Sequence, residues 1–260
     1  MKVLKTDYYD FCQKVDSFLN INLLHYKENQ MKRRLMSLYE KKGYKDFQEY
    51  FLAIKTNEKI RSEFLDRITI NVSEFFRNGA RWEVLEKEIL PSLVKGKSKI
   101  KVWSAACSTG EEAYTLVMVL SNFFDLRNIQ IIATDIDDMV LQKARIGKYN
   151  EFSVKECPPR YLQKFFVKKD NDYYVSDEVK RCVTFKKQDL LKDKYDTMHD
   201  LIVCRNVMIY FTEDAKEKLY YKFSDALKSG GVLFVGSTEQ IFQPQKFSLA
   251  TENTFFYKKI

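Results

Sequence analysis

Apolar residues recur at the spacing of an amphipathic α-helix over the first part of the chain, up to about residue 72. Three stretches show this spacing, and their apolar positions are Phe11, Val15, Phe18 and Leu19, then Met31, Leu35, Leu38 and Tyr39, and then Phe47, Tyr50, Phe51 and Ile54. Gly43 interrupts the pattern as a glycine beyond a helix C-terminus does, and a further helix is predicted from Glu58 to Ile68. No strand-like alternation occurs here, so residues 1–72 are predicted to form an all-helical domain.

The pattern changes at about residue 98, where short β-rich runs begin to alternate with amphipathic stretches. The predicted strands are Ile100–Ser104, Ile129–Thr134, Asp200–Cys204 and Gly231–Gly236, and the predicted helices are Glu111–Phe124, Asp138–Ile146 and Glu213–Leu227. Such alternation is typical of βαβ units, so residues 73–260 are predicted to form an α/β domain with a doubly wound sheet. Two apolar runs, Phe247–Ala250 and Thr254–Lys258, are predicted to form a C-terminal antiparallel hairpin because a short turn joins them.

Residues 158–187 do not follow this alternation. They start with Pro158-Pro159, continue into a short predicted helix at Tyr161–Phe166, and then carry short apolar runs separated by polar turns. The runs are Phe166–Lys169, Tyr173–Val175 and Cys182–Lys186. The sequence therefore predicts a small antiparallel β insertion on the main sheet.

Composition and charge narrow the possible function classes. The 260 residues carry a formal net charge of +8, which favours a negatively charged partner such as nucleic acid, an anionic membrane surface or an acidic protein face. The five cysteines include no C-x-x-C pair and there are only two histidines, which argues against a disulfide scaffold and against a metal site. No apolar run approaches the ~18 residues of a membrane helix and no secretory signal is evident, so we expect a cytoplasmic protein without membrane insertion.

The first candidate site is the segment Val102–Tyr114, which predicts a strand, a turn of small residues and a helix. Small residues let the backbone approach a ligand, and the free N–H groups of a helix N-terminus can face that ligand. Gly110 is the single glycine, so the dinucleotide fingerprint is absent, and Glu111 and Glu112 would repel a pyrophosphate. The segment fits a cationic ligand without phosphate, such as a sulfonium amino acid. A plain strand-to-helix connection with capping acids is the alternative.

Two further segments place polar residues at the carboxyl ends of predicted strands, the edge at which open α/β sheets bind ligands. Asp135 and Asp137 follow the second strand, where Asp137 is the better helix N-cap and Asp135 the better ligand for a ribose diol. Arg205 and Asn206 follow the strand that ends at Cys204, and polar residues there are costly to bury unless they are paired or bind a ligand. A helix cap in the first case and simple exposure in the second are the alternatives.

The segment Thr69–Asn78 joins the two predicted domains. It alternates polar and apolar residues and then reaches Phe75, Phe76 and Arg77. Taken alone, it is consistent with a linker that packs the two aromatic rings into the core.

Four segments occur together in the order found in the CheR-type chemotaxis receptor methyltransferases. They are Asn71-Val-Ser-Glu-Phe-Phe-Arg77, Trp103-Ser-Ala-Ala-Cys-Ser-Thr-Gly-Glu-Glu112, Asp135-Ile-Asp137 and Cys204-Arg-Asn-Val-Met-Ile-Tyr-Phe211. The chain resembles this family over nearly its whole length, including the N-terminal helices and the antiparallel insertion. The resemblance implies a class I methyltransferase fold and an enzyme that transfers methyl from S-adenosylmethionine to glutamate side chains on the cytoplasmic helices of chemoreceptors, releasing S-adenosylhomocysteine.

The resemblance also implies roles for individual residues. Arg77 and Tyr210 correspond to the proposed catalytic pair of the family. The implied cofactor contacts are Asn71, Ser73, Arg77, Gly110, Glu112, Asp135, Asp189, Leu190, Arg205 and Asn206. Among these, Asp135 would hold the ribose, and Asp189 and Leu190 would flank the adenine.

Three positions depart from the family pattern. Ser73 stands where threonine is usual, Cys107 where alanine is common, and Asp189 where asparagine is common. The first two changes are mild. An ionised Asp189 cannot donate the hydrogen bond that an asparagine amide would donate, so its contact with the adenine differs from that of the family.

The second predicted helix carries a basic stretch. Lys32, Arg33 and Arg34 are consecutive, and positions 26–45 hold seven basic and two acidic residues. Three consecutive residues fan over roughly 200° of a helix, so they cannot all be buried beside Met31. The resemblance implies that this helix docks on the acidic methylation region of the receptor, which would recruit the enzyme to membrane receptor arrays; a solvated helix face is the alternative. We expect a monomer that needs neither nucleic acid nor a metal.

Two other functions compete with this hypothesis. One is a class I methyltransferase that acts on nucleic acid or on a small molecule. Cys157-Pro-Pro-Arg-Tyr161 has a faint similarity to the Asn/Asp-Pro-Pro-aromatic motif of enzymes that methylate amino groups of nucleic acids, but Cys and Arg occupy two of its key places. The other is a non-catalytic receptor-binding protein that senses the cofactor, against which the intact Arg77, Asn206 and Tyr210 argue.

Overall fold

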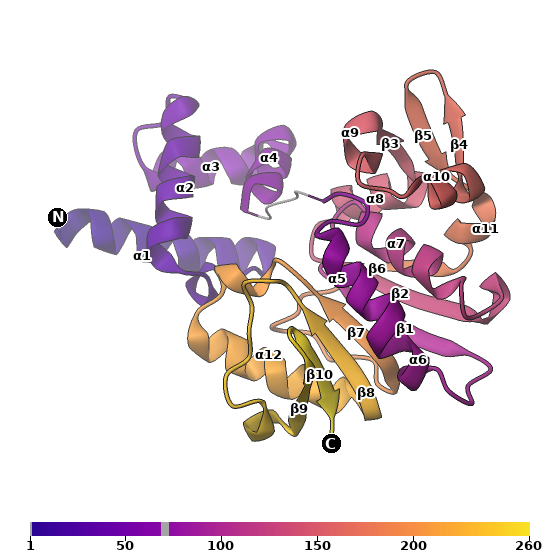
Figure 1. The fold of residues 1–260 in the computed structure, drawn as a ribbon. Coiled ribbons are helices and arrows are strands. Elements are labelled where there is room, and N and C mark those ends of the chain that lie inside the picture. Colours follow the sequence, from indigo (N-terminus) through magenta and orange to yellow (C-terminus); the bar gives the residue numbers. More distant parts are fainter. Residues whose placement is uncertain (1, 69–72) are drawn as a thin grey trace. The chain divides into compact units, whose positions relative to one another are not determined.

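The computed structural model describes residues 2–68 and 73–260, and the chain divides into two compact units (Figure 1). The first consists of the described residues up to Ile68 together with the segment Tyr210–Lys216. The second consists of the described residues from Ser73 to Ile209 and of Glu217–Ile260. None of the described helices combines the length and the apolar composition that a membrane span requires.

The described part of the first unit is helical, as the apolar spacing predicts. Its helices, drawn in indigo to violet in Figure 1, are α1 (Lys2–Leu19), the 3₁₀ turn η1 (Leu23–His25), α2 (Glu28–Lys41), α3 (Phe47–Thr56) and α4 (Glu58–Ile68). Gly43 follows the end of α2, which confirms the predicted break. Aromatic rings from different helices form the core: the ring centre of Phe11 lies 5.0 Å from that of Phe47 and 6.1 Å from that of Phe64.

The first unit also contains a segment from late in the chain. Phe211 forms an antiparallel bridge with Tyr26, and the centres of their rings lie 5.1 Å apart. The backbone N–H of Lys27 donates to the carbonyl oxygen of Tyr210 at 2.9 Å. Main-chain pairing therefore joins Tyr210–Lys216 to the helical unit, which the sequence pattern did not predict.

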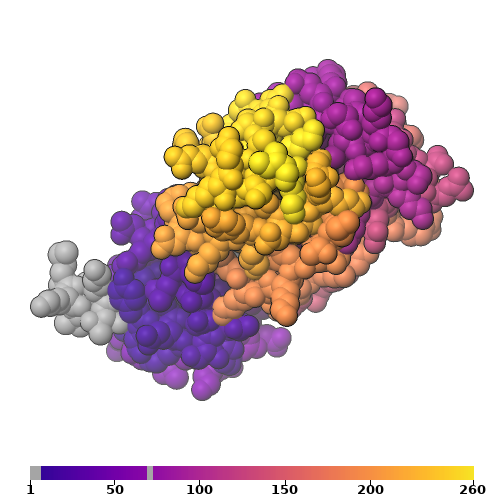
Figure 2. Space-filling model, turned by 90° about the horizontal axis from the view of Figure 1, so that it is seen from below, coloured from indigo at the N-terminus to yellow at the C-terminus, as the bar shows by residue number. Residues whose placement is uncertain are grey.

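The second unit is built on a sheet whose described strands have the order β6-β2-β1-β7-β8-β10-β9. These strands are β1 (Ile100–Ala105), β2 (Ile129–Asp135), β6 (Val183–Lys187), β7 (His199–Cys204), β8 (Leu227–Val235), β9 (Leu249–Asn253) and β10 (Phe256–Lys259). Strands β6, β2, β1, β7 and β8 are parallel, whereas β10 is antiparallel to both of its neighbours. This arrangement confirms the doubly wound sheet with a C-terminal hairpin, whose atoms are yellow in Figure 2.

Helices and helical turns precede β1 and connect the later strands of this sheet. They are α5 (Gly79–Val84), the π-helical turn η2 (Leu85–Ile89), α6 (Leu90–Leu93), α7 (Glu111–Leu120), η3 (Leu126–Asn128), α8 (Asp138–Ile146), η4 (Met208–Tyr210), α12 (Glu213–Ala226) and η5 (Pro244–Phe247). Helix α7 leads from β1 towards the β6 edge, and α12 leads from β7 in the opposite direction. Because parallel crossovers are right-handed, α7 and α12 cover opposite faces of the sheet.

A second, antiparallel sheet has the strand order β3-β5-β4. Its strands are β3 (Lys148–Asn150), β4 (Phe166–Lys169) and β5 (Asp172–Val175), and short helices accompany it: α9 (Glu151–Val154), α10 (Pro159–Phe165) and α11 (Asp177–Lys180). The bounds 158–187 predicted for this insertion differ from the structure at both ends. Strand β3 lies before that range, and the run Cys182–Lys186 belongs to the main sheet, where β6 pairs parallel with β2. The four-residue α11 redirects the chain, and so short a helix leaves no periodic signal in a sequence.

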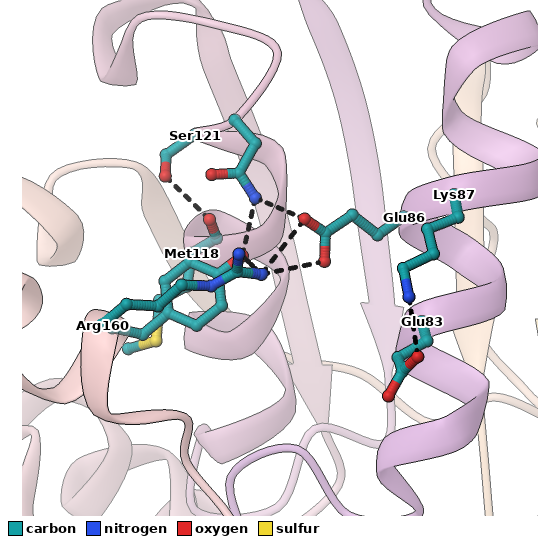
Figure 3. Close-up of polar contacts among 8 residues, drawn as sticks. Glu83, Glu86, Lys87, Met118, Ser121 and Arg160 are labelled. Carbon is teal, nitrogen blue, oxygen red and sulfur yellow. Dashed lines mark hydrogen bonds and ion pairs between the residues drawn. The ribbon is translucent and has the colours of Figure 1, made fainter.

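The Pro-Pro-Arg-Tyr stretch begins helix α10 and supports the linker that enters the second unit. The rings of Tyr161 and Phe76 are stacked, with their centres 5.2 Å apart. Asn122 donates to the Tyr161 hydroxyl at 2.6 Å and to Glu86 at 2.8 Å. Figure 3 shows Arg160 and Glu86 pointing toward one another, and their closest atoms lie 3.3 Å apart. The stretch therefore packs under the linker, and these contacts give it a structural role.

Candidate active site

The carboxyl ends of the parallel strands bring four loops to one edge of the main sheet. These are the loops after β1, β2, β6 and β7. Strand β1 has β2 on one side and β7 on the other, so the direction of winding reverses beside it. Ligands of open α/β sheets bind outside such a switch point. Each predicted cofactor contact after residue 100 lies at the end of one of these strands, in the loop that follows, or, for Glu112, in the first turn of α7.

The buried Arg205 forms an ion pair with the partly buried Glu112 at this edge. The distance from Arg205 Nη1 to Glu112 Oε2 is 3.5 Å, and the two side chains are 3% and 15% exposed, respectively. Ser104 Oγ donates to the other carboxylate oxygen at 2.9 Å. Burial raises the pKa of Glu112, and the Arg205 guanidinium opposes that rise. Simple exposure at a strand end is therefore wrong for Arg205, since buried charges persist where partners and hydrogen bonds satisfy them.

Arg205 also holds the backbone of the linker at Arg77. Its Nη2 donates to the carbonyl oxygen of Arg77 at 2.8 Å and to Asn78 Oδ1 at 3.3 Å. The guanidinium carbon lies 5.2 Å from the ring centre of Trp82 and 4.8 Å from that of Phe234. The structure thus brings together two predicted site residues that are 128 positions apart in the sequence.

The linker reaches this position through two aromatic residues. Phe75 is fully buried and Phe76 is 5% exposed, which confirms that both rings pack into the core. Phe76 has a left-handed backbone with φ of 55°. Burial raises the pKa of Glu111, and the Thr109 hydroxyl, which donates to its carboxylate at 2.7 Å, and the Ser73 hydroxyl oppose that rise. Asn71 lies outside the described residues, so its predicted cofactor contact stays a prediction.

Asp135 ends β2 and is 7% exposed. Its Oδ2 accepts from the backbone N–H of Ser108 at 2.9 Å, and its Oδ1 accepts from the backbone N–H of Asp137 at 3.1 Å. Burial raises the pKa of Asp135 to about 6. Each carboxylate oxygen can accept a further hydrogen bond, so the site remains suited to a diol. Asp137 caps α8 by accepting from Met139 N at 2.8 Å, as the sequence predicts.

Two buried polar atoms at this edge have no hydrogen-bond partner among the described residues: Ser108 Oγ and Arg205 Nε. Leaving a buried polar group unbonded costs about 1–3 kcal/mol. The backbone is also left-handed at Ser108 (φ 50°) and, in the loops after β1 and β7, at Ala106 (φ 61°) and Asn206 (φ 60°). Unbonded atoms and strained backbone cluster at ligand sites. A ligand with carboxylate and hydroxyl groups, such as S-adenosylmethionine, fits these residues.

Gly110 was predicted to contact the cofactor, and the structure shows that it also has a role in helix packing. Its φ is 95°, and an added Cβ would lie 2.9 Å from the Cβ of Ala144 and 3.2 Å from the hydroxyl oxygen of Tyr149. Any side chain here would push α7 away from α8. The packing of these two helices therefore requires the glycine, whether or not its backbone meets a cofactor.

The loop after β6 adjoins the Asp135 site. The backbone N–H of Gln188 donates to the carbonyl oxygen of Asp135 at 2.9 Å. Asp189 Oδ1 accepts from the backbone N–H of Leu191 at 2.8 Å, so this carboxylate oxygen supports the loop itself. The side chain of Leu190, the other residue predicted to flank the adenine, is buried with 7% exposed.

Glu239 is a component of the site that the sequence analysis missed. Its Oε2 accepts from the backbone N–H groups of Asn206 and Gly236, both at 2.8 Å, and its Oε1 accepts from that of Ile209 at 3.1 Å. A Cβ on Gly236 would lie 2.4 Å from the same carboxylate. One buried acid thus fixes the loop that carries Arg205 and Asn206. The only signal in the sequence is a single acid shortly after a strand, which is too common to identify it.

In the first unit, the three predicted docking cations have different surroundings. Arg33 is exposed, whereas Lys32 and Arg34 are half-buried. Lys32 Nζ lies 5.5 Å from the ring centre of Tyr8. The guanidinium carbon of Arg34 lies 5.5 Å from the ring centre of Tyr210, and Arg34 also donates to a backbone carbonyl of α4. Tyr210, predicted to be catalytic, is thus held within the helical unit.

A basic groove of about 560 Å³ lies between α2 and α4. It is lined by Gln30, Arg33, Arg34, Ser37, Leu38, Lys41, Glu63 and Arg67. Glu63, the single acid in this lining, forms an ion pair with Lys42 at 2.6 Å. The groove therefore presents a surplus of positive charge, which suits an acidic partner.

The chain is similar to known proteins over nearly its whole length. Residues 71–256 match the family model described as "CheR methyltransferase, SAM binding domain", and residues 6–69 match "CheR methyltransferase, all-alpha domain". Chemotaxis protein methyltransferases of Listeria innocua and Listeria monocytogenes are each 44% identical over 257 residues, which cover 98% of this chain and 98% of each relative. The chemotaxis protein methyltransferase of Borreliella burgdorferi is 37% identical, with 85% of this chain and 83% of the relative covered.

Proposed function

Because this chain belongs to the CheR methyltransferase family, we propose that it methylates glutamate side chains on the cytoplasmic helices of chemoreceptors. It is an S-adenosylmethionine-dependent methyltransferase of chemotaxis. The products would be glutamate methyl esters and S-adenosylhomocysteine. The observation that supports this most is the ion pair of Glu112 with the buried Arg205, which also donates to the Arg77 backbone and lies beside buried polar atoms that have no partner among the described residues. We further propose that the enzyme acts as a monomer in the cytoplasm, recruited to receptor arrays.

S-adenosylmethionine supplies a methyl group on a sulfonium centre, which is electrophilic toward a carboxylate oxygen. Asp135 would accept hydrogen bonds from the ribose hydroxyls. Glu112 and Arg205 would bind the amino-acid end, and Asp189 and Leu190 would flank the adenine. The remaining proposed contacts are Asn71, Ser73, Arg77, Gly110 and Asn206.

The proposed substrate places modest demands on acid–base chemistry. A glutamate side chain is ionised near pH 7, so no base is needed to generate the nucleophile. What the protein must supply is alignment, which contributes up to roughly 7–11 kcal/mol when it is ideal. Arg77 would orient the carboxylate, and Tyr210 would orient the carboxylate or the sulfonium. Arg77 is assigned to positioning, because tight binding of the ionised substrate would slow a reaction in which that charge is lost.

The basic groove of the first unit would bind the acidic face of the receptor helix. Arg33, Lys41 and Arg67 are exposed cations of its lining. Complementary charge accelerates encounter and fixes the register of two partners. This assigns recruitment to the helical unit and binding of the cofactor to the α/β unit.

The direct test is methyl transfer to membranes that contain chemoreceptors, using the full chain and S-adenosylmethionine with a labelled methyl group. Methyl esters hydrolyse in mild alkali, so the label should appear on the receptor and be released as methanol at alkaline pH. Mass spectrometry of receptor peptides should then place the label on glutamate residues.

Two outcomes would contradict the proposal. Label that resists alkali would favour a different methyltransferase. So would label that enters a small molecule, or that enters nucleic acid to which the protein binds in a salt-dependent way. Binding of S-adenosylhomocysteine and of receptor without any transfer would favour a non-catalytic sensor.

A further inference from the structure

Lys222 of α12 holds the loop that follows β6. Its ammonium donates to the carbonyl oxygens of Leu190 at 2.7 Å and Asp193 at 2.8 Å, and the carbonyl oxygen of Leu191 lies 3.4 Å away. Nζ also lies 4.1 Å from the ring centre of Tyr195. A lysine ammonium has three donors, and here all of its hydrogen-bonding partners are main-chain oxygens of one short loop.

Tyr195 completes this arrangement. Its hydroxyl donates to the carbonyl oxygen of Leu190, the same oxygen that Lys222 contacts. Its ring packs against Trp103 of β1, with ring centres 4.6 Å apart, and against Phe223 of α12 at 5.6 Å. The Tyr195 ring therefore ties the loop to β1 and α12. These carbonyl groups replace the part of its hydration that the half-buried Lys222 ammonium loses.

The loop satisfies its own N–H groups but leaves carbonyl groups for Lys222. Asp193 Oδ2 accepts from the backbone N–H of Asp189 at 2.8 Å, and Asp189 Oδ1 accepts from that of Leu191 at 2.8 Å. The start of the loop is tied to the Asp135 carbonyl through Gln188. The start of the loop is thus fixed beside Asp135, the residue proposed to bind the ribose. Lys222 fixes the part of the loop that follows.

We propose that Lys222 is a positioning residue for the adenine end of the cofactor. By holding the carbonyl groups of Leu190, Leu191 and Asp193, it keeps the Leu190 side chain and the Asp189 turn in the conformation that receives the adenine. This inference rests on the proposed function, because it takes Asp189 and Leu190 as the adenine contacts. Lys222 itself touches neither the proposed substrate nor the reacting atoms.

The test compares Lys222→Met with Lys218→Met in the full chain. Methionine keeps much of the apolar stem of lysine but has no donor, and Lys218 is an exposed residue on the same helix. Lys222→Met should raise the KM for S-adenosylmethionine at least fivefold and leave kcat at saturating cofactor within twofold of wild type. Calorimetry with S-adenosylhomocysteine and with adenosine should show the same fold loss for both, because the adenine end is common to them. Lys218→Met should match the wild type.

Lys222→Arg and Tyr195→Phe keep the proposal testable if Lys222→Met does not fold. Arginine can still donate to the carbonyl groups and should recover most of the affinity. Removing the tyrosine hydroxyl should give a smaller loss than Lys222→Met. Unchanged affinity in Lys222→Met, or a joint fall in kcat and melting temperature that arginine does not rescue, would overturn the role of Lys222. Failure of the wild type to bind S-adenosylhomocysteine would instead overturn the proposed function.

Discussion

In the helical unit the cations Arg33, Lys41 and Arg67 face solvent around an open groove, whereas in the α/β unit Arg205 and Glu239 are buried and hydrogen-bonded. Exposed charges act over about 8–10 Å and are weakened by salt. Buried charges act at contact distance, and salt screens them much less. The difference implies that salt and point substitutions can separate recruitment of the receptor from chemistry on its side chains.

The largest expected effect is on stability and tests whether the buried charges are paired. Arg205→Met leaves the partly buried Glu112 carboxylate without its ion-pair partner, so the free energy of unfolding should fall by about 3–5 kcal/mol. Arg33→Met, the matched change at an exposed arginine, should alter it by no more than about 0.5 kcal/mol. Urea denaturation measures both.

A double variant sharpens this prediction. Arg205→Met combined with Glu112→Gln removes both charges, so it should recover part of the lost stability. If Arg205→Met and Arg33→Met were equally stable, the contrast between buried and exposed charge would not hold.

The next largest expected effect is on turnover, and it is tested with one variant in each unit. Arg77→Ala and Tyr210→Phe should each lower methyl transfer about 10²-fold, because the reacting groups lose alignment. Affinity for S-adenosylhomocysteine should change far less in Tyr210→Phe. Rates and thermal melts must be taken on the same preparations. A fall in rate that only follows a loss of folded protein would remove the residue from the chemistry.

Asp135 offers a test with a pH signature. Asp135→Asn should weaken S-adenosylhomocysteine at least about tenfold at pH 7, because charge-assisted hydrogen bonds contribute about 1.5–3 kcal/mol. The wild-type affinity should fall as the pH drops through about 6, where the buried carboxylate gains a proton. The variant should lack that dependence. Calorimetry from pH 5 to pH 8 would show it, and a flat wild-type profile would contradict the assignment.

The raised pKa of Asp135 has the opposite effect on the stability of the ligand-free protein from its effect on ligand affinity. Burial favours the protonated form of Asp135, so this group stabilises the fold at low pH. That contribution should be lost as the pH rises through about 6. Ligand affinity and ligand-free stability should therefore change in opposite directions over the same pH range.

The smallest effect concerns the groove and depends on salt. Arg33→Glu with Lys41→Glu should slow methylation of intact receptors roughly tenfold at low ionic strength, and the loss should shrink as salt is added. Arg34 is unsuitable for this test because it lies over the ring of Tyr210, so its replacement would mix docking with chemistry. Cofactor affinity is the control and should not change. Equal rates at low salt would show that this face is only solvated.

The main sheet could be predicted because its strands and helices alternate with clear periods. Strands β1 and β2 are followed by long helices, and both appear in the apolar pattern. The helical turns from Gly79 to Leu93 received no prediction, since a π-helical turn in their middle disrupts the regular period. Strand β6 was placed in the wrong sheet, because pairing partners depend on contacts far along the chain.

The candidate site was predictable where a residue lies in a local motif. Asp135 and Arg205 stand directly at strand ends, so their place at this edge of the sheet follows from the strand pattern. Their burial depends on contacts with distant residues and could not be predicted. Glu239 and Lys222 act on backbone groups of distant loops. Almost any loop can offer such N–H and carbonyl groups, so no residue pattern identifies which acid or lysine will bind them.

The pairing of Tyr26 with Phe211 and of Lys27 with Tyr210 makes the helical module discontinuous in the sequence. A gene exchange that replaces only the first 70 or so codons would leave the two paired segments with sequences from different parents. Chimeras between relatives should therefore tolerate a swap of the helical module best when residues 210–216 come from the same parent. Where receptor preference diverges among such enzymes, these two stretches should diverge together.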